Sequence, residues 1–117
     1  MSPKSPITTH VLDTARGRPA AGIPVCLERA DLAGAWTELA RGVTNADGRA
    51  GELLPPGSTL APGEYRLGFD TAGYFASNGV SGFYPRVLVI FLVEDGAQHH
   101  HVPLLLSPYG YSTYRGS

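Results

Sequence analysis

Glycine and proline interrupt this chain so often that a long helix has nowhere to form. Fifteen glycines and ten prolines are spread through the 117 residues, and short runs rich in β-branched and aromatic residues lie between them. A strand needs only about 4–8 residues, whereas a stable amphipathic helix needs several uninterrupted turns. The chain is therefore predicted to be all-β, with short strands packed as a sandwich.

Eight strands are expected, each bounded by turn-forming residues. Their predicted ranges are Ile7–Asp13, Ile23–Ala30, Trp36–Gly42, Arg49–Leu53, Glu64–Asp70, Arg86–Val93, His99–Leu106 and Tyr111–Gly116. One short helix is predicted over Ala72–Ser77. Asp70 and Thr71 would cap its start, and Asn78–Gly79 would end it, with the glycine in the left-handed conformation.

The length of the chain fits one domain with a single core. Residues 7–117 are predicted to form this domain. Residues 1–6 are predicted to be a disordered lead-in without the apolar region of a secretory signal, and a cytoplasmic location is therefore expected. Nine Lys and Arg residues are spread along the chain against ten Asp and Glu residues, so the net charge is −1. This balance argues against nucleic acid or an anionic membrane as the partner.

The segment Val87–Val93 is apolar at every position. It is far shorter than the roughly 20 residues of a membrane-spanning helix. Glu64–Asp70 alternates between apolar and polar residues, as a strand with one solvated face does. Because Val87–Val93 does not alternate, both of its faces are predicted to be covered, and a second subunit is the expected cover of the outer face.

The four histidines lie in two of the predicted strands. His10 is in the first strand, and His99, His100 and His101 begin the seventh. Alternate residues of a strand share a face, so His99 and His101 should point one way and His100 the other. If the apolar residues of these strands face the core, His10 and His101 both look outward. Two outward imidazoles on an open face can build a site.

Other interpretations of the histidines stay open at this point. An exposed strand histidine is most often a solvated surface residue. A tag remnant does not fit the triplet, because Val102–Leu106 continues the strand pattern directly after it. A zinc site made by His10, His99 and His101 is chemically possible, since three imidazoles suffice for a catalytic zinc. The flanking sequence offers no evident carboxylate to orient these imidazoles, and no cofactor is expected.

Arg49 follows the Asp47–Gly48 turn and begins a strand. It is either a surface cation at a strand end or a planar fork that binds a carbonyl or an anionic heterocycle. The last predicted strand places Ser112, Tyr114 and Gly116 on one face. That strand is either a frayed sheet edge or part of a site.

Five segments of the chain carry a family pattern. They are Thr8–Thr14, Gly17–Ala20, Thr44–Arg49, Gly73–Ser77 and His101–Ser117. Together they resemble the transthyretin-like 5-hydroxyisourate hydrolases, and the resemblance runs from Ile7 to Ser117. The closing Tyr-Arg-Gly-Ser is the signature that separates these enzymes from transthyretin, the hormone carrier.

The resemblance implies a two-sheet, eight-strand transthyretin-like β-sandwich with one short helix. It further implies a homotetramer with active sites at the subunit interfaces. The catalytic residues of the family fall on His10, Arg49 and His101, and its substrate-binding tetrapeptide falls on Tyr114, Arg115, Gly116 and Ser117. His100 departs from the pattern, because the family usually has an aromatic residue between two histidines. Its side chain should point away from His101, with little effect on activity.

The implied reaction is the hydrolysis of 5-hydroxyisourate to 2-oxo-4-hydroxy-4-carboxy-5-ureidoimidazoline, in urate degradation towards allantoin. Histidine has an unperturbed pKa of about 6.5, which suits a general base near neutral pH. We assign His101 as the base, His10 as a residue that shares the proton or orients water, and Arg49 as the stabiliser of the developing charge. Tyr114 and the Ser117 carboxylate would shape the pocket.

Two other functions are weighed against this one. The first is a transthyretin-like carrier that binds a ligand in its channel without catalysis. A carrier has no need of His10, Arg49, His101 and the closing tetrapeptide together, which favours the enzyme. The second is a zinc-dependent hydrolase, for which a strong chelator would abolish activity.

Overall fold

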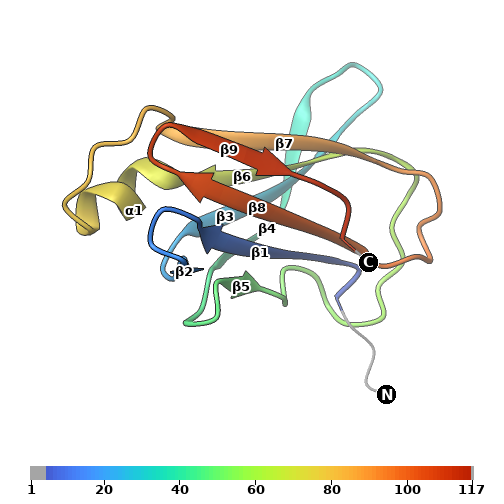
Figure 1. Cartoon of the computed structure of the whole chain (residues 1–117). Coiled ribbons are helices and arrows are strands. Elements are labelled where there is room, and N and C mark those ends of the chain that lie inside the picture. The colour runs from blue at the N-terminus through green and yellow to red at the C-terminus, as the bar shows by residue number, and fades with distance from the viewer. Residues whose placement is uncertain (1–4, 117) are drawn as a thin grey trace.

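The fold is known from a computed structural model, which describes residues 5–116. Within them, strands form two layers, and one short helix lies at an end of the sandwich (Figure 1). The elements are β1 (Ile7–Asp13), β2 (Arg18–Pro19), β3 (Pro24–Ala30), β4 (Trp36–Val43), β5 (Arg49–Ala50), β6 (Gly63–Asp70), α1 (Thr71–Ser77), β7 (Arg86–Val93), β8 (His100–Ser107) and β9 (Gly110–Thr113). No helix in this range is long and apolar enough to cross a membrane.

The two sheets share the core between them, so the predicted all-β sandwich is confirmed. One sheet has the order β2-β1-β8-β9, with β5 also paired to β1, and the other has the order β4-β3-β6-β7. β1 and β8 run parallel, and the remaining pairs are antiparallel. The parallel pair joins two segments that are distant in the sequence, and it carries Thr8, His10 and His101 of the site described below.

Strand alternation decides which side chains enter the core. Every second residue of β1 and β6 is buried. The largest fully buried side chains are Tyr65, Phe69, Ile7, Ile23, Leu27, Leu67, Leu104, Leu106, Val11, Val87, Val93 and Thr9. Since they come from both sheets, they form one apolar layer whose removal from water stabilises the sandwich. The opposite residues of β1 and β8 remain on the outer face of their sheet.

Three strand predictions need correction. β2 was not predicted, because two residues are too short to show an alternating pattern. The strand predicted to reach Leu53 ends at Ala50, since the chain leaves the sheet there and Leu53 is buried in the core instead. The last strand ends at Thr113, and beyond it Gly116 forms an isolated bridge with His101.

The predicted helix is confirmed and begins one residue earlier, since Thr71 is its first residue and not a cap, and the Thr71 hydroxyl donates to the Tyr84 carbonyl oxygen. Asp70 is the N-cap and accepts a hydrogen bond from the Gly73 backbone N–H. Gly79 follows the helix with a φ of 68°, in the left-handed region that favours glycine. The backbone N–H groups of Gly79 and Val80 donate to the carbonyl groups of Ala76 and Phe75, as in a Schellman motif.

The outer face of β7 is largely exposed in the part of the chain that the structure describes. Val87, Val89 and Val93 are buried, as expected for the inner face. The outward side chains of Leu88, Ile90 and Leu92 are 51%, 56% and 58% exposed. The prediction that a second subunit covers this face therefore stays a prediction.

The segment before β1 is partly described. Ser5 is buried, and its hydroxyl donates to the Ile7 carbonyl oxygen and accepts from the Leu54 N–H. The Pro6 carbonyl oxygen accepts from the His100 N–H. Two residues of the predicted disordered lead-in thus pack on the fold, while residues 1–4 lie outside the described range.

Candidate active site

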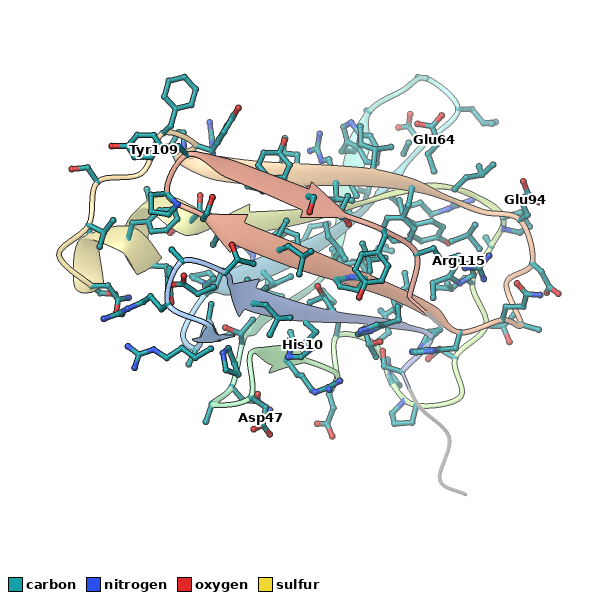
Figure 2. All side chains as sticks on the ribbon, viewed as in Figure 1. His10, Asp47, Glu64, Glu94, Tyr109 and Arg115 are labelled. Carbon is teal, nitrogen blue, oxygen red and sulfur yellow. The ribbon has the colours of Figure 1, made fainter. Side chains whose placement is uncertain are left out.

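The outer face of the five-stranded sheet carries the candidate catalytic residues. His10 on β1 is the register partner of Arg49 on β5, and Thr8 on β1 is the partner of His101 on β8. Directly paired residues share a sheet face, and diagonal neighbours are roughly 7–8 Å apart. His10 is therefore directly paired with Arg49 and diagonal to His101 on one face, and β1 lies between Arg49 and His101. Figure 2 shows His10 between β1 and β5.

A tight turn sets the position of Arg49. Gly48 has a φ of 75°, and a Cβ on it would lie 2.4 Å from the Val11 carbonyl oxygen, so glycine is required there. The Asn45 side-chain oxygen accepts hydrogen bonds from the backbone N–H groups of Asp47 and Arg49, at 2.9 and 3.1 Å. The Arg49 backbone is thereby fixed while its exposed side chain extends from the sheet.

A cleft of about 930 Å³ lies where the start of β1, the end of β4, the turn before β5, the loop after it and the start of β8 meet. The polar residues on its wall include Thr8, Asn45, Arg49, Glu52, His99 and His101. Arg49 and His101 thus share one cleft. His10 is on the same sheet face, but it is not part of the cleft wall. Thr8, Asn45 and Glu52 were not among the residues predicted for the site.

Thr8 connects two of the histidines. Its Oγ1 lies 2.9 Å from His99 Nε2 and 2.8 Å from His101 Nδ1. The two imidazole rings stack, with centroids 6.3 Å apart and planes inclined by 20°. Both rings are half-buried and point outward, as the alternation predicted. The contact of Thr8 with the two histidines was not predicted, because the pairing of β1 with β8 is not visible in the sequence.

The residues of the predicted substrate-binding tetrapeptide lie in different surroundings, and Gly116 is the one that contacts His101. The Gly116 N–H donates to the His101 carbonyl oxygen at 2.8 Å, and a Cβ on Gly116 would lie 2.5 Å from His101 Cδ2. Arg115 is turned away from His10 (Figure 2) and donates to Gln98 Oε1 at 3.1 Å. Tyr114 is 57% exposed. Ser117 lies outside the described residues.

His100 points into the core, as predicted. It is 4% exposed, and its Nδ1 is buried without a hydrogen-bond partner among the described residues. Burial, and secondly the charge of Arg115, lower the pKa of His100 below its ordinary value of 6.5, although the Gln98 backbone and Asp95 act in the opposite direction. A cavity of about 290 Å³ adjoins the ring, between Phe91, Tyr114 and their neighbours.

We expect His100→Phe to raise the free energy of unfolding by at most about 1–3 kcal/mol, because it removes a buried Nδ1 that has no partner among the described residues. Loss of the hydrogen bond between the ring and the Gln98 backbone offsets part of this gain. The gain should be larger at acidic pH. The unfolded chain takes up a proton as the pH falls through about 6.5, whereas the folded chain resists this until a lower pH, so the native protein loses stability over that window. Urea unfolding of both proteins between pH 8 and pH 5 measures the difference. A gain that does not grow towards acidic pH would contradict the buried-imidazole explanation.

The three-imidazole zinc set is not assembled within one chain. Among residues 5–116, no group of three or more His, Cys, Asp or Glu side chains is arranged to hold a metal ion. His99 and His101 are close, but Thr8 lies between their ring nitrogens. The polar groups of the cleft are thus imidazoles, a guanidinium, an amide, a hydroxyl and a carboxylate. Such groups can bind a polar heterocycle, orient water and accept its proton.

Fold and site together define a β-sandwich protein with an open cleft whose wall includes two imidazoles and a guanidinium. The model of the HIUase/Transthyretin family matches residues 7–116, and the chain belongs to this family. The 5-hydroxyisourate hydrolase of Mus musculus is 51% identical over 97% of this chain and 96% of its own length.

Solved structures agree with this assignment. The structure of Klebsiella pneumoniae 5-hydroxyisourate hydrolase is similar with a TM-score of 0.82 and 38% identity, over 95% of this chain and 98% of that chain. Sea bream transthyretin in complex with thyroxine has a TM-score of 0.88 and 32% identity, over 96% of this chain and 95% of that chain. The fold alone therefore does not separate hydrolase from carrier.

Proposed function

We propose that this protein hydrolyses 5-hydroxyisourate to 2-oxo-4-hydroxy-4-carboxy-5-ureidoimidazoline, as a cyclic amidohydrolase of urate degradation in purine metabolism. The observation that carries the proposal is the meeting of Arg49 and His101 in one cleft, with His10 beside them on the same sheet face. The relatives named as hydrolases support it, since they are 51% and 38% identical against 32% for transthyretin.

The reaction needs a base for water and a stabiliser for the charge that develops on the carbonyl oxygen. In our proposal His101 removes a proton from water as its oxygen attacks the carbonyl carbon of the ring amide. The carbon–nitrogen bond then breaks, and the ring nitrogen takes up the proton. Arg49 presents two or more N–H donors to the developing oxyanion, and His10 orients the water or shares its proton.

We further propose that the active protein is a homotetramer with sites completed at subunit interfaces. Three features of the single chain support this. Leu88, Ile90 and Leu92 are exposed on an edge strand, β7 and β9 both end their sheets, and Tyr114 is exposed beside the site-bearing sheet. A partner chain would cover these surfaces and bring further groups to an open cleft. A cytoplasmic location belongs to the same proposal.

A direct assay tests the proposed activity. Hydroxyisourate is generated from urate with urate oxidase, and its decay is followed by ultraviolet absorbance with and without the protein. We expect a large acceleration by the native protein and none by the heat-unfolded protein. A protein that leaves the decay unchanged while binding an aromatic ligand would instead be a carrier. Loss of activity with a strong chelator would favour the zinc-dependent alternative.

A further inference from the structure

The hydroxyl group of Thr8 lies between two imidazoles that belong to the far end of the chain. Thr8 is 91 residues from His99 and 93 from His101, yet its Oγ1 is within 3 Å of a ring nitrogen of each. The parallel register of β1 and β8 brings this about by pairing Thr8 with His101. All three residues line the cleft that also holds Arg49.

The hydroxyl group limits which nitrogens carry protons. A threonine hydroxyl has one proton to donate and two lone pairs with which to accept. It can therefore donate to one of the two imidazoles but not to both. At least one of His99 Nε2 and His101 Nδ1 must then be an N–H group that donates to Thr8. The state of each histidine is thus linked to the state of the other through one side chain.

We propose that Thr8 is a positioning residue that sets the tautomer of His101, an inference that rests on the proposed function. In the assignment that suits a general base, His101 Nδ1–H donates to Thr8 Oγ1, and the Thr8 O–H donates to His99 Nε2. Nε2 of His101, the ring nitrogen turned away from Thr8, then carries the lone pair that takes the proton of water. His99 fixes the direction of the hydroxyl.

The same arrangement stabilises His101 after it has accepted the proton. The imidazolium keeps its Nδ1–H bond to Thr8 Oγ1, and a hydrogen bond to a charged donor is stronger than one to a neutral donor. An orienting group behind a catalytic histidine acts in this way in other hydrolases, where an ionised carboxylate holds the tautomer and its loss costs about 10⁴-fold in rate. A neutral hydroxyl should contribute less than a carboxylate.

Substitution of Thr8 separates the positioning role from a structural one. Thr8→Val keeps the shape of the side chain and removes the hydroxyl, and we expect kcat to fall by about 10- to 100-fold, less than in the carboxylate case. Thr8→Ser restores the hydroxyl and should restore most of the rate. Thr14→Val is the matched control, because Thr14 directly follows β1 and its hydroxyl donates to the Leu106 carbonyl oxygen of β8 at 3.2 Å. Its rate should match that of the native protein.

The tautomer can be measured without any substrate. Nitrogen-15 spectra of imidazole-labelled protein distinguish a protonated from an unprotonated ring nitrogen, and His101→Asn identifies the His101 signals. In the native protein at mildly alkaline pH, we expect His101 to carry its proton on Nδ1. In Thr8→Val the proton should move largely to Nε2. Thr8→Ala provides the same test if the valine variant does not fold.

The outcomes distinguish the inference from the proposed function. If the native protein does not accelerate hydroxyisourate decay, the proposed function fails, whatever the spectra show. If the native protein is active, a Thr8→Val variant with native kcat overturns the inference. Equal losses in Thr8→Val and Thr8→Ser, or a His101 tautomer unchanged by Thr8→Val, also overturn it. Loss in valine, recovery in serine and the expected proton shift together support it.

Discussion

Replacing His101 with alanine is expected to lower kcat for hydroxyisourate hydrolysis by about 10²–10⁴-fold, the range typical for loss of a general base. The chain should remain folded, because His101 lies on the outer sheet face and its neighbours Val102 and Leu104 supply the core contacts of β8. Steady-state kinetics with oxidised urate, together with circular dichroism, measure both effects.

The neighbouring histidine provides the matched control. His100 directly precedes His101 and points to the opposite face of β8. The kcat of the His100→Phe variant should therefore stay close to the native value. The same assay on His10→Ala measures how much His10 contributes to catalysis beside His101. We expect kcat to fall in the same range. Near-native turnover by both His10→Ala and His101→Ala would refute the catalytic assignment.

Arg49→Lys is expected to lower kcat by about 10²–10³-fold, the range found when one oxyanion donor is removed. Lysine keeps the positive charge, but its ammonium group cannot reproduce the planar fork of N–H donors. The backbone bond from residue 49 to the Asn45 side chain should persist, so the turn is retained. An unchanged kcat and KM in the lysine variant would show that charge alone suffices or that Arg49 has no catalytic part.

A second arginine controls for the general effect of this exchange. Arg41 is exposed on β4 and pairs with Glu38 at 2.7 Å, on the sheet that does not carry His10 and His101. Arg41→Lys should therefore leave the kinetics unchanged. Arg49 takes part in neither of the two ion pairs among residues 5–116, so no carboxylate of that range forms an ion pair with its guanidinium.

Much of the fold could be predicted from local sequence patterns, namely strand alternation and helix capping. Alternation in β1, β6 and β8 correctly separated inward from outward side chains, including the opposite directions of His100 and His101. Capping chemistry located the helix. β2 was missed and β5 was predicted too long, because strands of two residues are defined by their pairing to β1 and not by any pattern of their own.

The site was harder to predict than the fold, because it depends on which strands are neighbours. The sequence singles out His10, Arg49 and His101 by type and by family resemblance. It does not show that Thr8 faces His101, since this follows from the parallel register of β1 and β8. It also gave no sign that Arg115 turns towards Gln98, because the regular alternation of β9 ends at Thr113 before that residue.

The parallel pairing of β1 with β8 also determines when this protein can finish folding during its synthesis. β3, β4, β6 and β7 pair in a nearly sequential, antiparallel order, so their sheet can form while the chain is still growing. β1 can pair early with β2 and β5, but its parallel pairing with β8 must wait for residues more than 90 positions downstream, and closing so long a loop slows folding. A nascent chain stalled before β8 leaves the ribosome should therefore have no working cleft, because His99 and His101 have not yet reached Thr8.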